Sequence, residues 1–115
     1  MVRLIDRGIS LKELKEIAHK GFGNLVKAVV DVKREIMAIG GELHSDEEEF
    51  LLRRGSSQNN LWGINLYPDL EGDEWIEFDS VINLRPSAGN LSRGIDNPQI
   101  REKICKIVKK LIRDE

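Results

Sequence analysis

The stretch LVKAVVDVKREIMAIGGEL, residues 25 to 43, decides the fold because two different structures fit it. Its β-branched runs are short and are separated by Lys33-Arg34-Glu35, which is typical of two antiparallel strands joined by a tight polar turn. One long helix over residues 24–39 is the alternative, because apolar residues also recur there at helical spacing. These residues are Leu25, Ala28, Val29, Val32, Ile36 and Ile39. The Val-Val-x-Val run and the Gly40-Gly41 pair favour the two strands.

Helix signals lie on either side of this stretch. Residues 10–13 form a capping box, in which Ser10 and Glu13 each satisfy the backbone amide of the other. An apolar stripe follows at helical spacing, and Gly21 supplies a stop, so we expect a helix over residues 10–20. Residues 45–48 form a second capping box, which predicts a short helix that starts at Ser45.

The rest of the chain adds strands and a last helix. Short strands are expected over residues 2–6, 61–67 and 75–84, and Asp96 or Asn97 with Pro98 opens a helix that runs to Arg113. The order is therefore β-α-β-β-α-β-β-α. It predicts an α+β fold, a single domain over residues 1–115 with a mostly antiparallel sheet of about five strands and two or three helices, gathered largely on one face.

The composition bounds the partners and the compartment. The 115 residues are 40% hydrophobic and 33% charged with a formal charge of −2, so there is no bulk attraction to nucleic acid or to an anionic membrane. The single cysteine, Cys105, cannot form an internal disulfide. No apolar run approaches the ~18 residues of a membrane span, and the first residues carry no signal-peptide core. We expect a cytoplasmic protein with no membrane partner.

Polar side chains gather on one face of the expected sheet. Because side chains alternate along a strand, the apolar residues of each strand can all face the helices. The opposite face then collects Glu42, His44, Asn65, Glu77, Asp79, Asn83 and Arg85. A solvated face of an antiparallel sheet is the plain alternative. Asparagine is a poor strand former, however, and two lie in mid-strand here, which favours a binding face.

His44 is the residue of this face suited to acid or base catalysis, because its charge changes near neutral pH. An ordinary histidine at the end of a strand is the alternative. The surrounding run ELHSDEE lacks the spacing of a zinc site, and its acids fit the first turn of a helix. We therefore expect no metal site.

The loop over residues 85–94 combines two arginines, hydroxyls and glycines just ahead of a helix. Such a loop can hold a phosphate or a carboxylate, with Arg85 and Arg93 as the anion contacts and Asn83, Asn90 and Ser92 orienting the ligand. The run is neither a Walker loop nor a dinucleotide-binding fingerprint. The alternative is a structural loop whose arginines pair with acids of the sheet, such as Glu77 and Asp79.

Three runs resemble a known family: GGELHSDEE at residues 40–48, NLWGINLYP at 60–68 and WIEFDSVINLRPSAGN at 75–90. The family is a small bacterial and archaeal group of uncharacterised proteins, classed as a domain of unknown function. Asn60 stands where an acid is expected. The resemblance implies one compact domain, and it brings no reaction, ligand or catalytic residue with it.

Three classes of function remain open. The leading hypothesis is a binding module for a small anionic ligand or a nucleic-acid phosphate, held by the sheet face and the 85–93 loop. A metal-assisted hydrolase or nuclease that uses His44 with Glu77 and Asp79 is the enzyme alternative. A protein–protein interaction module is the third. The sequence specifies no cofactor and no oligomeric state.

Overall fold

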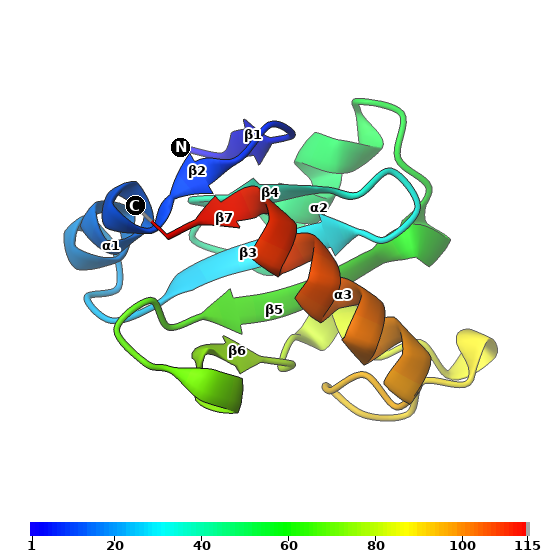
Figure 1. Cartoon of the computed structure of the whole chain (residues 1–115). Coiled ribbons are helices and arrows are strands. Elements are labelled where there is room, and N and C mark those ends of the chain that lie inside the picture. The colour runs from blue at the N-terminus through cyan, green and yellow to red at the C-terminus, as the bar shows by residue number, and fades with distance from the viewer. Residues whose placement is uncertain (115) are drawn as a thin grey trace.

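The computed structural model describes residues 1–114 and contains a five-stranded sheet in the order β1-β4-β3-β5-β6, antiparallel throughout (Figure 1). The strands are β1 (Arg3–Ile5), β3 (Val26–Asp31), β4 (Ile36–Ile39), β5 (Leu61–Leu66) and β6 (Ile76–Glu77). The helices are α1 (Leu11–Lys20), α2 (His44–Leu52) and α3 (Pro98–Leu111). β2 (Ile9–Ser10) and β7 (Ile112–Arg113) form a separate parallel pair. The predicted α+β class and element order are confirmed.

The stretch that decides the fold is a hairpin, so the two predicted strands are confirmed and the single long helix is wrong. In its register Asp31 lies opposite Ile36. The turn is held by the buried Asp31 carboxylate, whose Oδ1 accepts hydrogen bonds from the amides of Lys33 and Arg34, each at 2.9 Å. The β-branched residues of β3 suit this position, because a central strand buries both of its faces.

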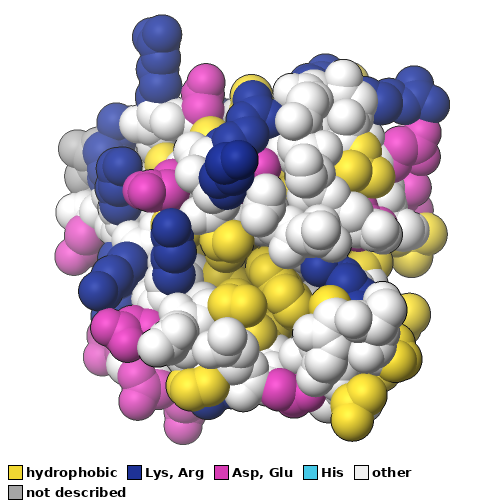
Figure 2. Space-filling model, turned by 90° about the vertical axis from the view of Figure 1, so that its right-hand side faces the viewer, with side chains coloured by type: hydrophobic (Ala, Val, Ile, Leu, Met, Phe, Trp, Pro, Cys, Tyr) yellow, Lys and Arg dark blue, Asp and Glu magenta, His cyan; other side chains and the backbone are white. Residues whose placement is uncertain are grey.

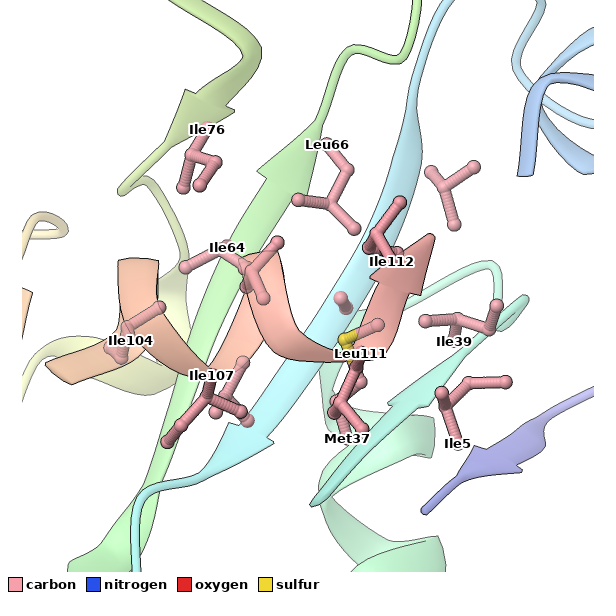
Figure 3. Packing of buried hydrophobic residues seen from close by; sticks show 14 of the residues in the cluster. Ile5, Met37, Ile39, Ile64, Leu66, Ile76, Ile104, Ile107, Leu111 and Ile112 are labelled. Atoms are coloured by element: carbon pink, nitrogen blue, oxygen red, sulfur yellow. The ribbon is translucent and has the colours of Figure 1, made fainter. Parts of the chain in front are cut away.

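The sheet separates two hydrophobic cores. The larger core lies between the sheet and the pair α1 and α3, and Figure 3 shows Ile104 and Ile107 of α3 near Ile64 of β5, and Leu111 next to Met37 of β4. The smaller core lies on the opposite face, where Leu51 of α2 packs with Val29, Ile36, Ala38 and Leu61. The expectation that the helices gather on one face therefore fails for α2, because β3 and β5 present apolar side chains to both sides of the sheet.

The two predicted capping boxes have different outcomes. Ser10 caps α1, since its Oγ accepts a hydrogen bond from the amide of Glu13 at 3.1 Å. The Glu13 carboxylate binds Arg3 instead of reaching back to Ser10. α2 begins one residue earlier than predicted, at His44, with Leu43 at the N-cap position and no side-chain cap. Ser45 therefore lies inside the first turn.

The two serines provide a matched test of these helix starts. Ser10→Ala should lower the free energy of unfolding by about 1 kcal/mol, because it removes a capping hydrogen bond. Ser45→Ala should change it by less than about 0.5 kcal/mol, because no cap is lost. Urea denaturation of both variants measures the difference. Equal losses would contradict the assignment of the caps.

The strand predicted over residues 75–84 is wrong beyond Glu77. β6 ends there, and the chain instead forms a 3-10 turn over Val81–Asn83. The alternation of Val81 and Ile82 with polar residues resembles a strand, but the Ser80 hydroxyl accepts a hydrogen bond from the Ile82 amide at 3.3 Å and bends the backbone. The chain at Ser80 can pack this closely against β5 because residue 63 is a glycine. A Cβ at that position would lie 2.6 Å from Cβ of Ser80, which is too close.

The last helix starts as predicted and ends early. Asn97 caps it by accepting a hydrogen bond from the amide of Gln99 at 2.9 Å. α3 ends at Leu111, because Ile112 and Arg113 become extended and pair with Ile9 and Ser10. None of the helices within residues 1–114 has the length and hydropathy needed to cross a bilayer.

Candidate functional site

The loop that follows β6 closes the open edge of β5. β6 pairs only with Asn65 and Leu66, so the earlier part of β5 has no strand on that side. The fully buried side chain of Asn83 takes the place of a strand there: its Oδ1 accepts from the Gly63 amide at 2.8 Å and its Nδ2 donates to the Gly63 carbonyl at 2.9 Å. Asn83 was predicted to contact a ligand, but its side-chain amide instead forms hydrogen bonds with the backbone of the sheet.

Asn90 and Ser92, also predicted ligand contacts, hold the loop together. Asn90 is buried, and its Nδ2 donates to the carbonyls of Asn83 and Gly94 at 2.7 and 2.8 Å. The Ser92 hydroxyl donates to the carboxylate of Asp96 at 2.8 Å. The polar atoms of both side chains are therefore engaged within the protein, which is the arrangement that the structural-loop alternative predicts.

The two arginines of the loop lie in different surroundings. Arg85 donates to the carbonyls of Leu61 and Ile82, and its guanidinium carbon lies 4.5 Å from the centroid of the Trp62 ring. Arg93 is exposed and donates through Nε to the Asp79 carboxylate at 2.7 Å. The strand pattern placed Arg85 on the polar face. It lies at the β5 edge instead, because the chain turns after Glu77.

Part of the predicted polar face is nevertheless assembled as a cluster of interacting side chains, and we call this cluster the polar recess: Lys27, His44, Asn65, Glu77, Asp79 and Arg93. At its base, Nε2 of His44 lies 2.8 Å from the carbonyl oxygen of Ile64. Because a carbonyl only accepts, Nε2 carries the proton, and Nδ1 is the acceptor when the ring is neutral. Burial lowers the pKa of His44, with Lys27 and Arg93 acting in the same direction. The ring is therefore neutral at neutral pH.

Asn65 forms the other part of the base. Its Nδ2 donates to Oε1 of Glu77 at 2.8 Å and contacts the Asp79 carbonyl at 3.4 Å. Both partners are acceptors, which fixes the amide with its nitrogen towards them. Oδ1 of Asn65 then points elsewhere, and it is buried with no hydrogen-bond partner among residues 1–114. Buried polar atoms are normally paired, so this atom calls for an explanation.

Lys27, which the sequence analysis missed, joins the recess to a cleft. It lies directly opposite Asn65 across β3 and β5, on the same face of the sheet. It also lines a cleft of about 650 Å³ between the end of α1 and the Gly40–Leu43 turn, which we call the α1 cleft. The signal in the sequence was one charged residue inside an otherwise apolar strand start, VKAVV.

The wall of the α1 cleft combines cations with apolar groups. Lys20 and Lys27 line it, and within the described residues neither has an ion-pair partner. Nζ of Lys27 lies 5.0 Å from the ring centroid of Phe22, which is 50% exposed. Glu42, expected on the polar face, is exposed and contributes the acidic side chain of the lining.

The environment of Glu47 was also missed in the sequence analysis, because the acids of the ELHSDEE run were interpreted only as favourable charges in the first turn of a helix. It is 0% exposed, and its Oε2 accepts a hydrogen bond from the Gly41 amide at 2.9 Å. Burial raises the pKa of Glu47 to about 9, against the opposing effects of that hydrogen bond and of Lys27. The side chain is therefore a neutral acid at pH 7, folded against Gly41 at the back of the turn that lines the α1 cleft.

A second groove carries three lysines, of which Lys106 and Lys110 are paired with carboxylates and Lys103 has no ion pair within residues 1–114. It lies between α3 and the β3–β4 turn, at the end of the molecule where Figure 2 shows hydrophobic side chains in a hollow with Lys and Arg around it. Lys106 and Lys110 line this groove, and each lies 3.3 Å from a carboxylate, of Glu102 and Glu35 respectively. Both of these acids line the groove, whereas the lining of the α1 cleft includes one acid among the described residues, so the cations of the α1 cleft are the better candidates for holding an anion.

The carboxylates named in the hydrolase alternative have partners of their own. Oε1 of Glu77 accepts hydrogen bonds from Asn65 and from the Tyr67 hydroxyl, and Asp79 pairs with Arg93. Within residues 1–114, no group of three or more His, Cys, Asp and Glu side chains is placed to hold a metal ion.

The comparison with protein families gives one match. Residues 3–111 match the family described as a protein of unknown function, DUF5674. The chain belongs to this family. The DUF5674 match runs from β1 to the end of α3, so the polar recess and the lining of the α1 cleft, apart from Met1, lie within the matched residues. No curated protein and no solved structure matches the chain significantly.

Proposed function

We propose that this chain is a binding module for a small anionic ligand, held in the α1 cleft by Lys20 and Lys27. The observation that carries the proposal is a cleft of about 650 Å³ with two lysines that have no acidic partner within residues 1–114. Lys27 is half-buried, and a half-buried cation that is unpaired in the protein favours an anion from outside, while the exposed Lys20 adds a second positive charge to the lining. The proposal keeps the class of ligand that the sequence suggests and moves the site away from the 85–93 loop.

The shape and charge of the cleft favour a small molecule over a nucleic-acid phosphate. Phe22 and Leu43 give it an exposed apolar wall, which suits an anion with an apolar body. The chain has a net charge of −2 and therefore no bulk attraction to a polyanion. Small organic phosphates and carboxylates are the ligand class that fits.

Calorimetric titration with phenyl phosphate and benzoate tests the proposal. Wild type should bind at least one of them, and Lys27→Ala should weaken that binding at least tenfold, because it removes the cation beside the aromatic wall. Lys12→Ala is the matched control, since Lys12 is exposed on α1 outside the cleft. No binding of either anion, or an equal loss in the two variants, would contradict the proposal.

The enzyme alternative retains one favourable observation. His44 is neutral, and its ring is oriented by a backbone carbonyl, as a general base needs to be. The protein-interaction alternative also retains one, because Val81, Leu84 and Leu91 of the loop after β6 are exposed. Neither observation identifies a substrate or a partner, so the anion-binding proposal has the fuller support.

A further inference from the structure

We infer that the anion bound beside Lys27 also carries a hydrogen-bond donor, a hydroxyl or an amide N–H, which Asn65 and His44 recognise in the polar recess. This inference rests on the proposed function, and it narrows the ligand to a small organic anion with a donor group near the charge. Three features of the recess lead to it: an unpaired acceptor, an oriented histidine and a neighbouring cation.

The unpaired acceptor is Oδ1 of Asn65. The residue is 8% exposed, and its amide nitrogen is committed to Glu77 and Asp79, so the amide cannot turn to satisfy its oxygen. Leaving a buried acceptor unpaired costs about 1 to 3 kcal/mol. A donor supplied by a ligand would remove this cost, which makes Oδ1 a group prepared for an N–H or an O–H.

The second acceptor is Nδ1 of His44. Its Nε2–H is directed to the carbonyl of Ile64, the residue that precedes Asn65 in β5, so the imidazole ring and the Asn65 side chain are neighbours. The hydrogen bond that His44 makes within residues 1–114 uses Nε2, which leaves Nδ1 as the acceptor of the neutral ring; unlike Oδ1 of Asn65, Nδ1 is not among the fully buried atoms that lack a partner. Acceptors contributed by neighbouring residues favour a ligand group that donates a hydrogen bond, and they disfavour a bare anion at that position.

The cation that completes the arrangement is Lys27. It lies opposite Asn65 in the sheet register, and such a pair has its Cβ atoms about 4.5 to 5.5 Å apart. An anionic group at Lys27 and a hydroxyl at Asn65 can therefore belong to one small molecule. Arg93 is exposed and forms an ion pair with Asp79 at 2.7 Å, and such a surface pair can rearrange at little cost when a ligand binds.

Paired ligands test the inference: benzoate against the three monohydroxybenzoates, and inorganic phosphate against ribose 5-phosphate. Wild type should bind at least one hydroxylated member ten or more times more tightly than its plain counterpart. Asn65→Ala should reduce that advantage to about twofold or less and leave binding of the plain anion unchanged, because Lys27 is untouched. Asn59→Ala, an exposed asparagine outside the recess, should keep the full advantage.

The outcomes separate this inference from the proposed function. Binding of plain anions that depends on Lys27, with no advantage for any hydroxylated partner, would overturn the inference alone and would leave Oδ1 of Asn65 to an ordered water. Absence of all binding would overturn both. If Asn65→Ala fails to fold, the wild-type affinities of the paired ligands still decide the question, because they need no variant.

Discussion

Replacing Asn83 with alanine is expected to lower the free energy of unfolding by about 3 to 5 kcal/mol, a larger loss than we expect for any other polar side chain of the loop after β6. The Asn83 amide satisfies both the N–H and the C=O of Gly63, and it also donates to the Arg93 carbonyl at 2.9 Å. In the variant the N–H and C=O of Gly63 lose this partner, while the Arg93 carbonyl keeps its hydrogen bond from the Ser80 amide. Since Asn83 is 0% exposed, water cannot replace the amide without opening the edge of the sheet.

Urea denaturation of Asn83→Ala measures this loss, and Asn83→Asp separates its two parts. The aspartate can still accept from the Gly63 amide but cannot donate to the two carbonyls, so it should remain strongly destabilising. Asn59→Ala, on the exposed surface, should change stability by less than about 0.5 kcal/mol. A loss below about 1 kcal/mol for Asn83→Ala would show that the edge of β5 is not sealed in this way.

The second large effect is a pH dependence that belongs to Glu47. Its pKa is about 9 in the folded chain and 4.5 as the ordinary value, which we take for the unfolded chain. Between these pH values the folded chain holds a proton that the unfolded chain has released. Raising the pH therefore favours unfolding. The free energy of unfolding that the raised pKa of Glu47 contributes is complete below pH 4.5, decreases by about 1.4 kcal/mol per pH unit above it, and is lost above pH 9.

Glu47→Gln removes this titration and keeps the shape of the side chain, whose amide oxygen can still accept from Gly41. From pH 5.5 to 7.5 the variant should gain on the order of 2 to 3 kcal/mol of stability relative to wild type. Urea denaturation of both proteins at the two pH values measures the gain. Other titrating groups cancel in the comparison, because both proteins contain them.

Glu16→Gln is the control, since Glu16 is exposed on α1. Its stability should follow that of wild type over the same pH interval, because this substitution leaves the buried Glu47 carboxyl in place. Parallel curves for wild type and Glu47→Gln would contradict the assignment of a neutral, buried acid at this position.

The candidate site was predictable only in part. Alternation along β5 correctly placed Asn65 on the face opposite Ile64, and the polar recess does contain His44, Asn65, Glu77 and Asp79. The same rule failed after Glu77, because it assumes that the strand continues. Lys27 and Glu47 were missed for another reason. The alternation pattern predicts which face of the sheet a residue occupies, but it does not show whether a charged side chain lacks an ion-pair partner, as Lys27 does within residues 1–114, or is buried away from water, as Glu47 is.

Local signals in the sequence determined α1, the β3–β4 hairpin and α3. The cap of Ser10, the β-branched runs and the Asn97-Pro98 start each act within a few residues, so the sequence alone predicts them. The end of α3, by contrast, depends on the pairing of Ile112 with Ile9. Only the tertiary structure decided the path of residues 78–94. Gly63 lies in another strand, and because it has no side chain, Ser80 can pack against it. Asn83 then forms hydrogen bonds with the N–H and C=O of Gly63, which takes the place of a longer β6 at this edge of β5.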